Sequence, residues 1–369
     1  MAQKRNFLVT AFLLTLGLSF FVGHGWAQDW QKEWERVLAA AEREGQVNVA
    51  GPPGDAYRTA LVETFQKRYP KVRIEFNGAS SRDQIPRVVR ERQAGVFNWD
   101  VYIGGAMSVL AALKPIGALD PLRPELILPE VLDNGKWHGG FDFGFVDSEG
   151  KLFLAFDGTL SEILYVNWDF VSPNELKSFK QLLEPKWAGK IVWDDPRQEG
   201  SGVNTALQLS LSYGEDFLRQ LFAKQKIVFT LDRRQLTEWV VRGRYPVGFS
   251  LPTDQLKRFL EIGTGKNVKP LDDPSLVSGI STGFGAFGVF NRRPHPNATK
   301  VYVNWLLSKE GQSSWTLHSG GRNSRRVDVP QGDPALGIKP DGKYIAFQTE
   351  KMIPRRQALM KMARDLIPQ

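Results

Sequence analysis

The sequence predicts an α/β protein built of two lobes, with a ligand cleft between them. Three observations predict this class. Short apolar strands alternate with amphipathic helices along most of the chain. The alternation loosens once, between residues 115 and 150, where Pro and Gly cluster. The length of 369 residues is enough for two domains with cores of ordinary size.

The first half of the chain repeats a strand, a loop and a helix three times, which is typical of parallel βαβ units. Trp34 and Val37 belong to an apolar stripe at helical spacing that ends at Gly45, where a C-terminal cap belongs. Asp55 caps the next helix, which stops before Pro70. The predicted helices are 29–45, 56–69, 82–95 and 106–114, and the predicted strands are 46–50, 72–76 and 99–103.

In the second half, two strand-like runs cross to a second α/β unit, and the alternation then resumes. The predicted strands are 152–156, 162–167, 190–193, 227–231, 246–251 and 283–290, and the predicted helices are 173–184, 203–213, 215–225, 233–243, a pair over 295–317, and 353–367. We expect the first lobe to hold residues 29–155 plus 276–318 and the second lobe residues 156–275 plus 319–369.

The N-terminus predicts export. Lys4 and Arg5 precede an apolar run over residues 7–22, and small residues follow it, so we expect a signal peptide over 1–27 that is cleaved near Ala27. The run has 16 residues, fewer than the roughly 20 that span a bilayer. No cysteine stands near the cleavage point to carry a lipid, and an exported protein without a tether suits the periplasm.

Composition excludes several classes of partner. The formal net charge is +8, and loss of Lys4 and Arg5 would leave 8 − 2 = +6, a mild excess that is scattered among acidic residues. Nucleic-acid binding would need a basic stripe with interleaved aromatics, so we expect no nucleic-acid partner. The chain has no cysteine, so its stability comes from ordinary cores without disulfides. We expect a monomer.

The segment 189–202, GKIVWDDPRQEGSG, raises the question of chemistry. Asp194 and Asp195 follow a strand, and consecutive strand residues point to opposite faces, so the two are poorly arranged as an acid and base on one substrate. Arg197 and the turn at Ser201 suit the binding of a polar ligand. Three interpretations stay open: ligand contact, capping of the following helix, and catalysis by a secreted hydrolase that uses Asp194 or Asp195 with Glu199.

Other motifs predict neither a cofactor nor a metal site. GFGAFG over 283–288 matches a dinucleotide fingerprint by letter, but no helix follows it directly, so we interpret it as a strand that crosses between lobes. The three histidines beyond the apolar run, His138, His295 and His318, have no ligand spacing. An oxygen-only site for a hard cation stays open.

Four loops rich in Gly or Ser are predicted at the ends of strands, where α/β sheets bind ligands. They are 51–55, 104–108, 194–202 and 278–283. Backbone N–H groups of such loops and the helices after them favour negative charge. The candidate ligand-binding residues are Tyr57, Ser80, Ser81, Arg82, Gly105, Tyr165, Asp194, Arg197 and Ser201.

The order of these pieces resembles the periplasmic solute-binding proteins of ABC transporters. The similarity is carried by EGQVNVAGPPG (44–54), WDVYIGG (99–105), PKWAGKIVWDDPRQEGSG (185–202) and, above all, PHPNATKVYVNWLLSKEGQ (294–312). It extends over nearly the whole chain after the signal, and more narrowly it is with the type II group that contains ferric-iron, thiamine, phosphonate and sugar-phosphate binders.

The resemblance implies the two-lobed type II periplasmic binding fold, with hinge closure on one small-molecule solute. It also implies delivery of that solute to an ABC permease and its ATPase complex in the inner membrane, with no covalent chemistry. Ferric binders of the group use adjacent tyrosines, and this chain has no such pair, so iron remains the alternative. The loops with Arg82 and Arg197 fit an anionic or zwitterionic solute better, and Asp157, Asp194 and Glu199 would suit a cationic group on it. Service as the sensing partner of a membrane receptor stays open.

Overall fold

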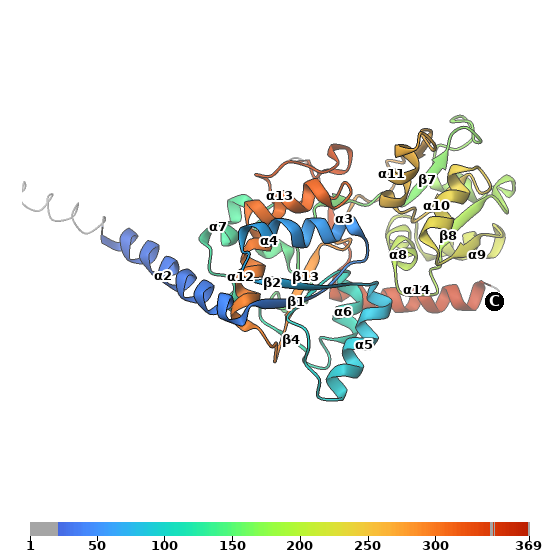
Figure 1. The fold of residues 1–369 in the computed structure, drawn as a ribbon. Helices are drawn as coiled ribbons and strands as arrows, with labels where there is room; N and C mark the ends of the chain where they lie inside the picture. The colour runs from blue at the N-terminus through green and yellow to red at the C-terminus, as the bar shows by residue number, and fades with distance from the viewer. Residues whose placement is uncertain (1–20, 340–341, 343, 368–369) are drawn as a thin grey trace, which may run out of the picture.

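The protein consists of two α/β lobes that face each other across a central gap in the ribbon (Figure 1). This computed structural model describes residues 21–339, 342 and 344–367. Each lobe is built around its own sheet, and a small third sheet lies where the chain passes between them. The α/β class predicted from the sequence is confirmed.

The first lobe contains a sheet in the order β2-β1-β3-β13-β4, with β5 also paired to β13. The neighbours of β1 are parallel to it, as the βαβ pattern predicts, whereas β13 enters antiparallel from far along the chain. Its strands are β1 (Gln46–Gly51), β2 (Arg73–Gly78), β3 (Val101–Ile103), β4 (Leu119–Asp120), β5 (Leu154–Ala155) and β13 (Ala286–Phe290). Its helices are α3 (Asp55–Arg58), α4 (Thr64–Arg68), α5 (Ser81–Gln93), α6 (Ala106–Ala112), α7 (Pro129–Leu132), α12 (Pro296–Leu307) and α13 (Lys309–His318).

The second lobe contains a sheet in the order β11-β7-β10-β8-β9, in which β10, β8 and β9 are parallel. Its strands are β7 (Leu164–Asn167), β8 (Ile191–Asp194), β9 (Val228–Thr230), β10 (Val247–Phe249) and β11 (Val268–Pro270). Its helices are α8 (Ser201–Tyr213), α9 (Glu215–Lys224), α10 (Arg233–Val241) and α11 (Thr253–Glu261). The third sheet consists of β6 (Thr159–Leu160), β12 (Gly279–Ser281) and β14 (Ile345–Ala346).

Each lobe has its own aromatic core behind its sheet. In the first, Phe65 packs edge-on against Tyr302 and Trp305, with ring centroids 5.2 and 5.3 Å apart. In the second, Trp193 of β8 stacks on Phe249 of β10 at 4.4 Å, and both rings are buried. The stacked rings of Trp193 and Phe249 hold together β8 and β10, whose ends lead into the loops between the lobes.

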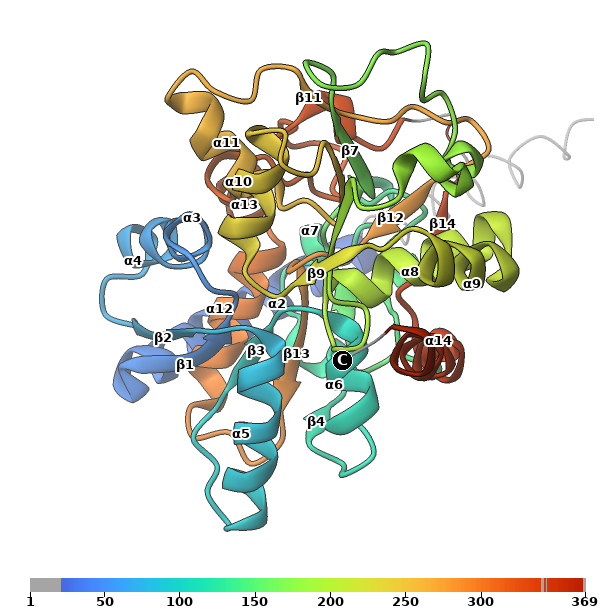
Figure 2. The ribbon, with the colours of Figure 1, turned by 90° about the vertical axis from the view of Figure 1, so that its right-hand side faces the viewer.

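The C-terminal helix α14 (Ile353–Leu366) joins the two lobes. It lies against α8 and α9 of the second lobe (Figure 2). At its start, Ile353 packs against a core cluster of the first lobe. The lobe boundaries expected from the sequence stay a prediction. Phe156 and Arg326, which that prediction assigns to the second lobe, both lie against first-lobe residues.

The N-terminal helix α2 (Phe21–Glu44) packs against α12 and projects from the first lobe, away from the second (Figure 1). The basic lead and nearly all of the apolar run that predict a signal peptide lie outside the described residues. The helix is continuous across Ala27, the predicted cleavage point. Within the described part of the chain, no helix is long and apolar enough to cross a bilayer.

Three sequence predictions about local structure are wrong. Asp55 does not cap its helix, because Gly54 is the N-cap residue, Asp55 is the first helical residue, and no side chain bonds to this cap. The helix expected over 173–184 is a single 3-10 turn, Phe179–Leu183, which starts at a capping box on Ser178 and ends before Pro185. Backbone N–H groups of this segment donate to side chains, Lys177 to Gln181 and Phe179 to Asp273, instead of to helical carbonyls. Conversely, the sequence did not predict the helix α11, although its amphipathic stretch follows β10 directly.

Candidate functional site

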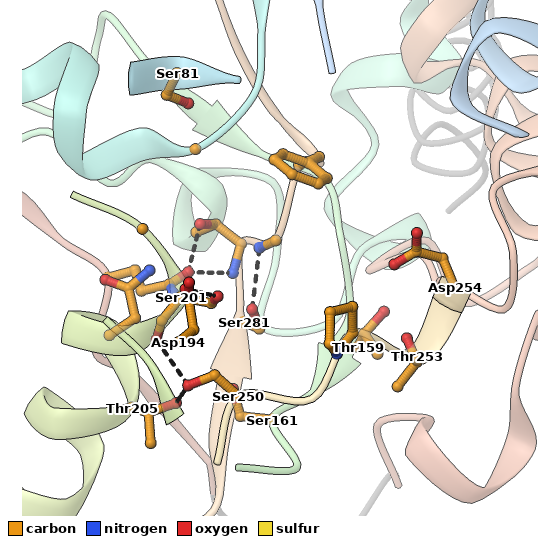
Figure 3. A pocket seen from close by; sticks show the side chains of 18 of the residues that line it. Ser81, Thr159, Ser161, Asp194, Ser201, Thr205, Ser250, Thr253, Asp254 and Ser281 are labelled. Atoms are coloured by element: carbon orange, nitrogen blue, oxygen red, sulfur yellow. Dashed lines mark hydrogen bonds between the residues drawn. The ribbon is translucent and has the colours of Figure 1, made fainter. Parts of the chain in front are cut away.

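A cavity of about 500 Å³ lies between the lobes, within the range that small ligands occupy. All four loops that the sequence singled out line it. A close view shows that many hydroxyl and carboxylate side chains from both lobes line its wall (Figure 3). The lining hydroxyl residues, besides Tyr57, are Ser80, Ser81, Ser108, Thr159, Ser161, Ser201, Thr205, Ser250, Thr253, Ser281 and Thr282.

Four helices longer than two turns begin at this cavity. Asp232 caps α10, which follows β9, through the N–H of Gln235. The other three are α5 after β2, α8 after β8 and α11 after β10. The first turn of a helix leaves backbone N–H groups without intrahelical partners, and its dipole favours negative charge. None of the three N-cap residues, Ser80, Gly200 and Pro252, supplies a side-chain hydrogen bond to that turn. The start of the shorter helix α6, at Gly105, also lines the cavity.

Asp194 and Asp195 point to different surroundings, as strand alternation predicts. Asp194 lines the cavity and accepts hydrogen bonds from the hydroxyl of Ser201 at 2.5 Å and the backbone N–H of Gly202 at 2.9 Å. Asp194 thus occupies the N-terminus of α8 in place of a cap. Asp195 does not line the cavity and instead pairs with the guanidinium of Arg197 at 2.8 Å.

The glycines of this loop are required by close packing. Gly200 has φ +151°, and a side-chain carbon at Gly202 would lie 1.9 Å from the backbone oxygen of Asp194. Because that neighbour is backbone, any side chain there would force the loop to move. The close approach lets the start of α8 sit directly on the end of β8.

Two arginines of the lining are matched by carboxylates. Arg322 pairs with Asp157 at 2.7 Å, and Asp157 is fully buried behind the lining. Burial acts to raise the pKa of Asp157 and the nearby Arg322 acts to lower it, with a net rise. Arg233 pairs with Asp254 at 2.5 Å at the start of α11. Each of these arginines therefore brings little net charge to the cavity.

Glu199 connects the two lobes. Its carboxylate accepts hydrogen bonds from Arg356 of α14 at 2.5 Å and from the Ser108 hydroxyl of the first lobe at 3.1 Å. Its backbone carbonyl accepts from the guanidinium of Arg82, also of the first lobe, at 2.8 Å. Among the described residues, Arg82 is the lining arginine that forms no ion pair with a carboxylate.

Tyr57 is the one tyrosine among the described lining residues, and burial raises the pKa of its phenol to about 12. A ferric site of the kind implied by the resemblance would use tyrosinates. No group of three or more His, Cys, Asp or Glu side chains within the described ranges has the geometry to hold a metal ion.

The structure brings seven of the nine sequence-predicted site residues to the cavity lining and leaves two outside it. The seven are Tyr57, Ser80, Ser81, Arg82, Gly105, Asp194 and Ser201. Arg197 turns back onto Asp195 and lies over the ring of Phe229. Tyr165 is buried in β7, and its hydroxyl donates to the carboxylate of Glu162, which does line the cavity.

Sequence reasoning missed lining residues that come from distant segments. Arg322 follows α13, Arg356 lies on α14, and Glu162 lies between β6 and β7. No local pattern marks them. Thr253 and Asp254 carried a usable signal, because the segment 250–254, SLPTD, stands between a strand and an amphipathic stretch like the other loops.

Residues 50–313 match the model of the family described as bacterial extracellular solute-binding protein, and the chain belongs to this family. It is thus a solute-binding protein that delivers a small solute to an ABC permease, and not an enzyme. The hydrolase interpretation is wrong. Of the carboxylates that it would use, Asp195 is held outside the cavity by Arg197, Asp194 accepts hydrogen bonds at the start of α8, and Glu199 pairs with Arg356.

Solved structures of binding proteins share this fold. The periplasmic binding protein AfuA from Actinobacillus pleuropneumoniae, with fructose-6-phosphate bound, is 19% identical with a TM-score of 0.69, covering 88% of this chain and 98% of that one. Iron-bound HitA from Pseudomonas aeruginosa is 17% identical with a TM-score of 0.65, covering 87% and 99%. The chain therefore has the type II periplasmic binding fold.

An uncharacterized protein from Haemophilus influenzae is 21% identical over 280 residues, which are 75% of this chain and 77% of that one. Membership of an extracellular family also means that the protein is exported.

Proposed function

We propose that the protein is the periplasmic substrate-binding subunit of an ABC importer and that it captures a small polar solute with an anionic group. The signal peptide directs export and is cleaved near Ala27. The protein works as a monomer that closes on its solute and passes it to the permease and its ATPase complex in the inner membrane.

The observation that carries the anionic solute is the pairing of Arg82 with the uncapped start of α5. Ser81 and Arg82 stand in the first turn of this helix, at the cavity. Backbone N–H groups, the helix dipole and a guanidinium then favour the same negative group. Arg82 now donates to a backbone carbonyl, a neutral acceptor that an anion would replace at a gain.

The surrounding hydroxyls support a phosphate ester or a similar oxyanion over a metal. Ser80 and Ser108 stand on the same wall as Arg82, and each has one O–H donor, which in this structure donates to Asp83 and Glu199 and which an oxyanion could accept instead. Two structural neighbours hold fructose-6-phosphate and iron respectively. A single lining tyrosine, with no cluster of His, Cys, Asp or Glu ligands among the described residues, favours a ligand of the first kind here.

A thermal-shift panel on protein that begins at Gln28 tests the proposal. The panel holds phosphate, phosphonates, sugar phosphates and dicarboxylates in one arm and ferric citrate, thiamine and polyamines in the other. A ligand at 100 times its Kd adds about 2.7 kcal/mol to stability, which raises Tm by a few degrees. We expect a rise with an oxyanion. A response to iron or polyamines alone would contradict the proposal.

A further inference from the structure

The charge balance of the cavity carries an inference about the rest of the solute. Ten charged side chains line it, six carboxylates and four arginines, so its formal charge is 4 − 6 = −2. A purely anionic solute is poorly matched to such a wall, even with helix dipoles in its favour. The carboxylates are Asp83, Glu162, Asp194, Glu199, Asp254 and Asp333, and the arginines are Arg82, Arg233, Arg322 and Arg356.

Five of the six carboxylates are already compensated. Glu199 and Asp254 pair with arginines, and the other three accept hydrogen bonds at helix starts. Asp194 lies at the start of α8, Asp83 is in the first turn of α5 and accepts from Ser80, and Asp333 caps a 3-10 turn through Ala335. The acids that the sequence suggested for a cationic group, Asp157, Asp194 and Glu199, are all in this satisfied state.

Glu162 is different. It stands in the crossover between β6 and β7, and its partner is the neutral phenol of Tyr165. In the part of the chain that the structure describes, no cation pairs with it. Burial and the nearby charge of Asp333 raise its pKa, while the bond from Tyr165 lowers it less. A carboxylate in such surroundings is stabilised by a cation that comes from outside the protein.

A buried oxygen that accepts no hydrogen bond also lines this cavity. Gln208 is fully buried, its amide nitrogen donates to the carbonyl of Val277 at 3.0 Å, and its Oε1 has no hydrogen-bond partner in the described structure. An unmet buried acceptor destabilises the protein, and a donor on the solute would remove that cost. The residues just after Val277 pair with those just before Glu162. The N–H of Ser161 donates to the carbonyl oxygen of Gly279 at 2.9 Å.

The segment that carries Glu162 lies away from the proposed anion site. Ser161, the neighbour of Glu162, stands across the cavity from Ser81 at the start of α5 (Figure 3). The side at α5 offers backbone donors and the guanidinium of Arg82, beside the carboxylate of Asp83. The other side offers a carboxylate, Glu162, that no described arginine there pairs with. A solute that satisfies both sides carries opposite charges at its two ends.

We propose that the solute is zwitterionic and carries a protonated primary amine that binds the carboxylate of Glu162, with Oε1 of Gln208 as a further acceptor. This rests on the proposed function, since the amine is recognised on a solute whose anionic end binds at α5. An ammonium group donates three hydrogen bonds and accepts none, so it matches the carboxylate of Glu162 and the free Oε1 of Gln208, which can only accept.

Two matched pairs of compounds test the proposal: 2-aminoethylphosphonate against ethylphosphonate, and glucosamine 6-phosphate against glucose 6-phosphate. Titration calorimetry on the full mature chain gives the Kd ratio within each pair. We expect at least one amine to bind about 10-fold tighter than its amine-free partner, as a charged hydrogen bond predicts. Glu162→Gln should bring that ratio close to one. The matched control, Glu238→Gln, removes a carboxylate outside the cavity and should keep the ratio.

The possible failures are separable. Equal affinities within both pairs on the unmodified protein would overturn the amine and leave the anion site standing. An amine preference that survives in Glu162→Gln would overturn the role of this residue. Failure of all four compounds, together with every oxyanion of the thermal-shift panel, would overturn the proposed function and the inference with it.

Discussion

The two walls of the cavity recognise a solute by different means. The first-lobe wall carries two charged side chains, Arg82 and Asp83, and is otherwise made of hydroxyls and the starts of α5 and α6. The opposite wall, from the second lobe, the crossovers and α14, carries the remaining eight of the ten charged side chains.

The difference teaches that binding and selectivity are divided between the walls. Backbone N–H groups at a helix start are held by the whole helix, so the first-lobe wall is ready before the solute arrives. The charges of the opposite wall are mostly paired with each other, as in Arg233 with Asp254, and so add shape more than net charge. Selectivity then depends on the few groups left unpaired there, Glu162 above all.

The largest effect is expected from the support behind the second wall. Trp193→Ala removes a buried ring stacked on Phe249 and should lower the free energy of unfolding by about 3–5 kcal/mol. Urea unfolding followed by circular dichroism measures it. The control Phe170→Ala, at a residue 60% exposed, should change stability by less than about 0.5 kcal/mol. Similar losses in both variants would mean that the core does not brace this wall.

The first wall is tested at its one arginine. Arg82→Ala should weaken an oxyanion identified by the thermal-shift panel by roughly 10- to 150-fold, the worth of a charge-assisted hydrogen bond. Arg197→Ala should change Kd less than about twofold, because Arg197 lies outside the lining and pairs with Asp195. Calorimetry on both variants decides. A large loss from Arg197→Ala alone would reverse the assignment and restore the expectation from the sequence.

The unpaired carboxylate of the second wall should respond to pH. The pKa of Glu162 is raised in the folded protein, so the stability cost of ionising it builds up as pH rises from the ordinary carboxyl range through the raised value, and it is absent below that range. Glu162→Gln should therefore be as stable as the unmodified protein at pH 4 and at least as stable at pH 7.5. The amine preference needs the ionised form and should fall severalfold over the same change to acid. Unfolding and calorimetry at the two pH values check both, and a preference independent of pH would argue against Glu162.

The smallest effect concerns the contact between the walls. Ser108→Ala removes a first-lobe hydrogen bond to Glu199, worth about 1 kcal/mol, so the ratio of open to closed molecules should rise roughly fivefold. The chain has no cysteine, so Lys67→Cys and Lys257→Cys can carry spin labels on exposed sites of the two lobes. Distances without added solute should lengthen. Ser80→Ala, whose hydroxyl contacts only Asp83 of its own lobe, serves as control, and equal distances in both variants would remove this contact from lobe closure.

Much of this arrangement was predictable because it is local. Strands that lead through Gly or Ser into helices marked the four loops, and these loops line the cavity. Alternation along β8 indicated that Asp194 and Asp195 face different ways, and they do. The export signal is equally local, since it depends on a basic lead and an apolar run. Such features follow from neighbouring residues alone.

The partners of charged groups depended on the tertiary structure. The sequence predicts that Arg197 contacts the ligand, yet in the fold this arginine pairs with Asp195. The fold also brings Arg322 and Arg356 to the cavity from more than a hundred residues away along the chain. The energy of a charge depends on what lies within a few ångströms of it, and that neighbourhood is set by chain crossings that no local pattern records. The sequence alone therefore determined the class of protein and the loops that face the solute. Only the folded chain decided which charges cancel and that Glu162 is left without a cation.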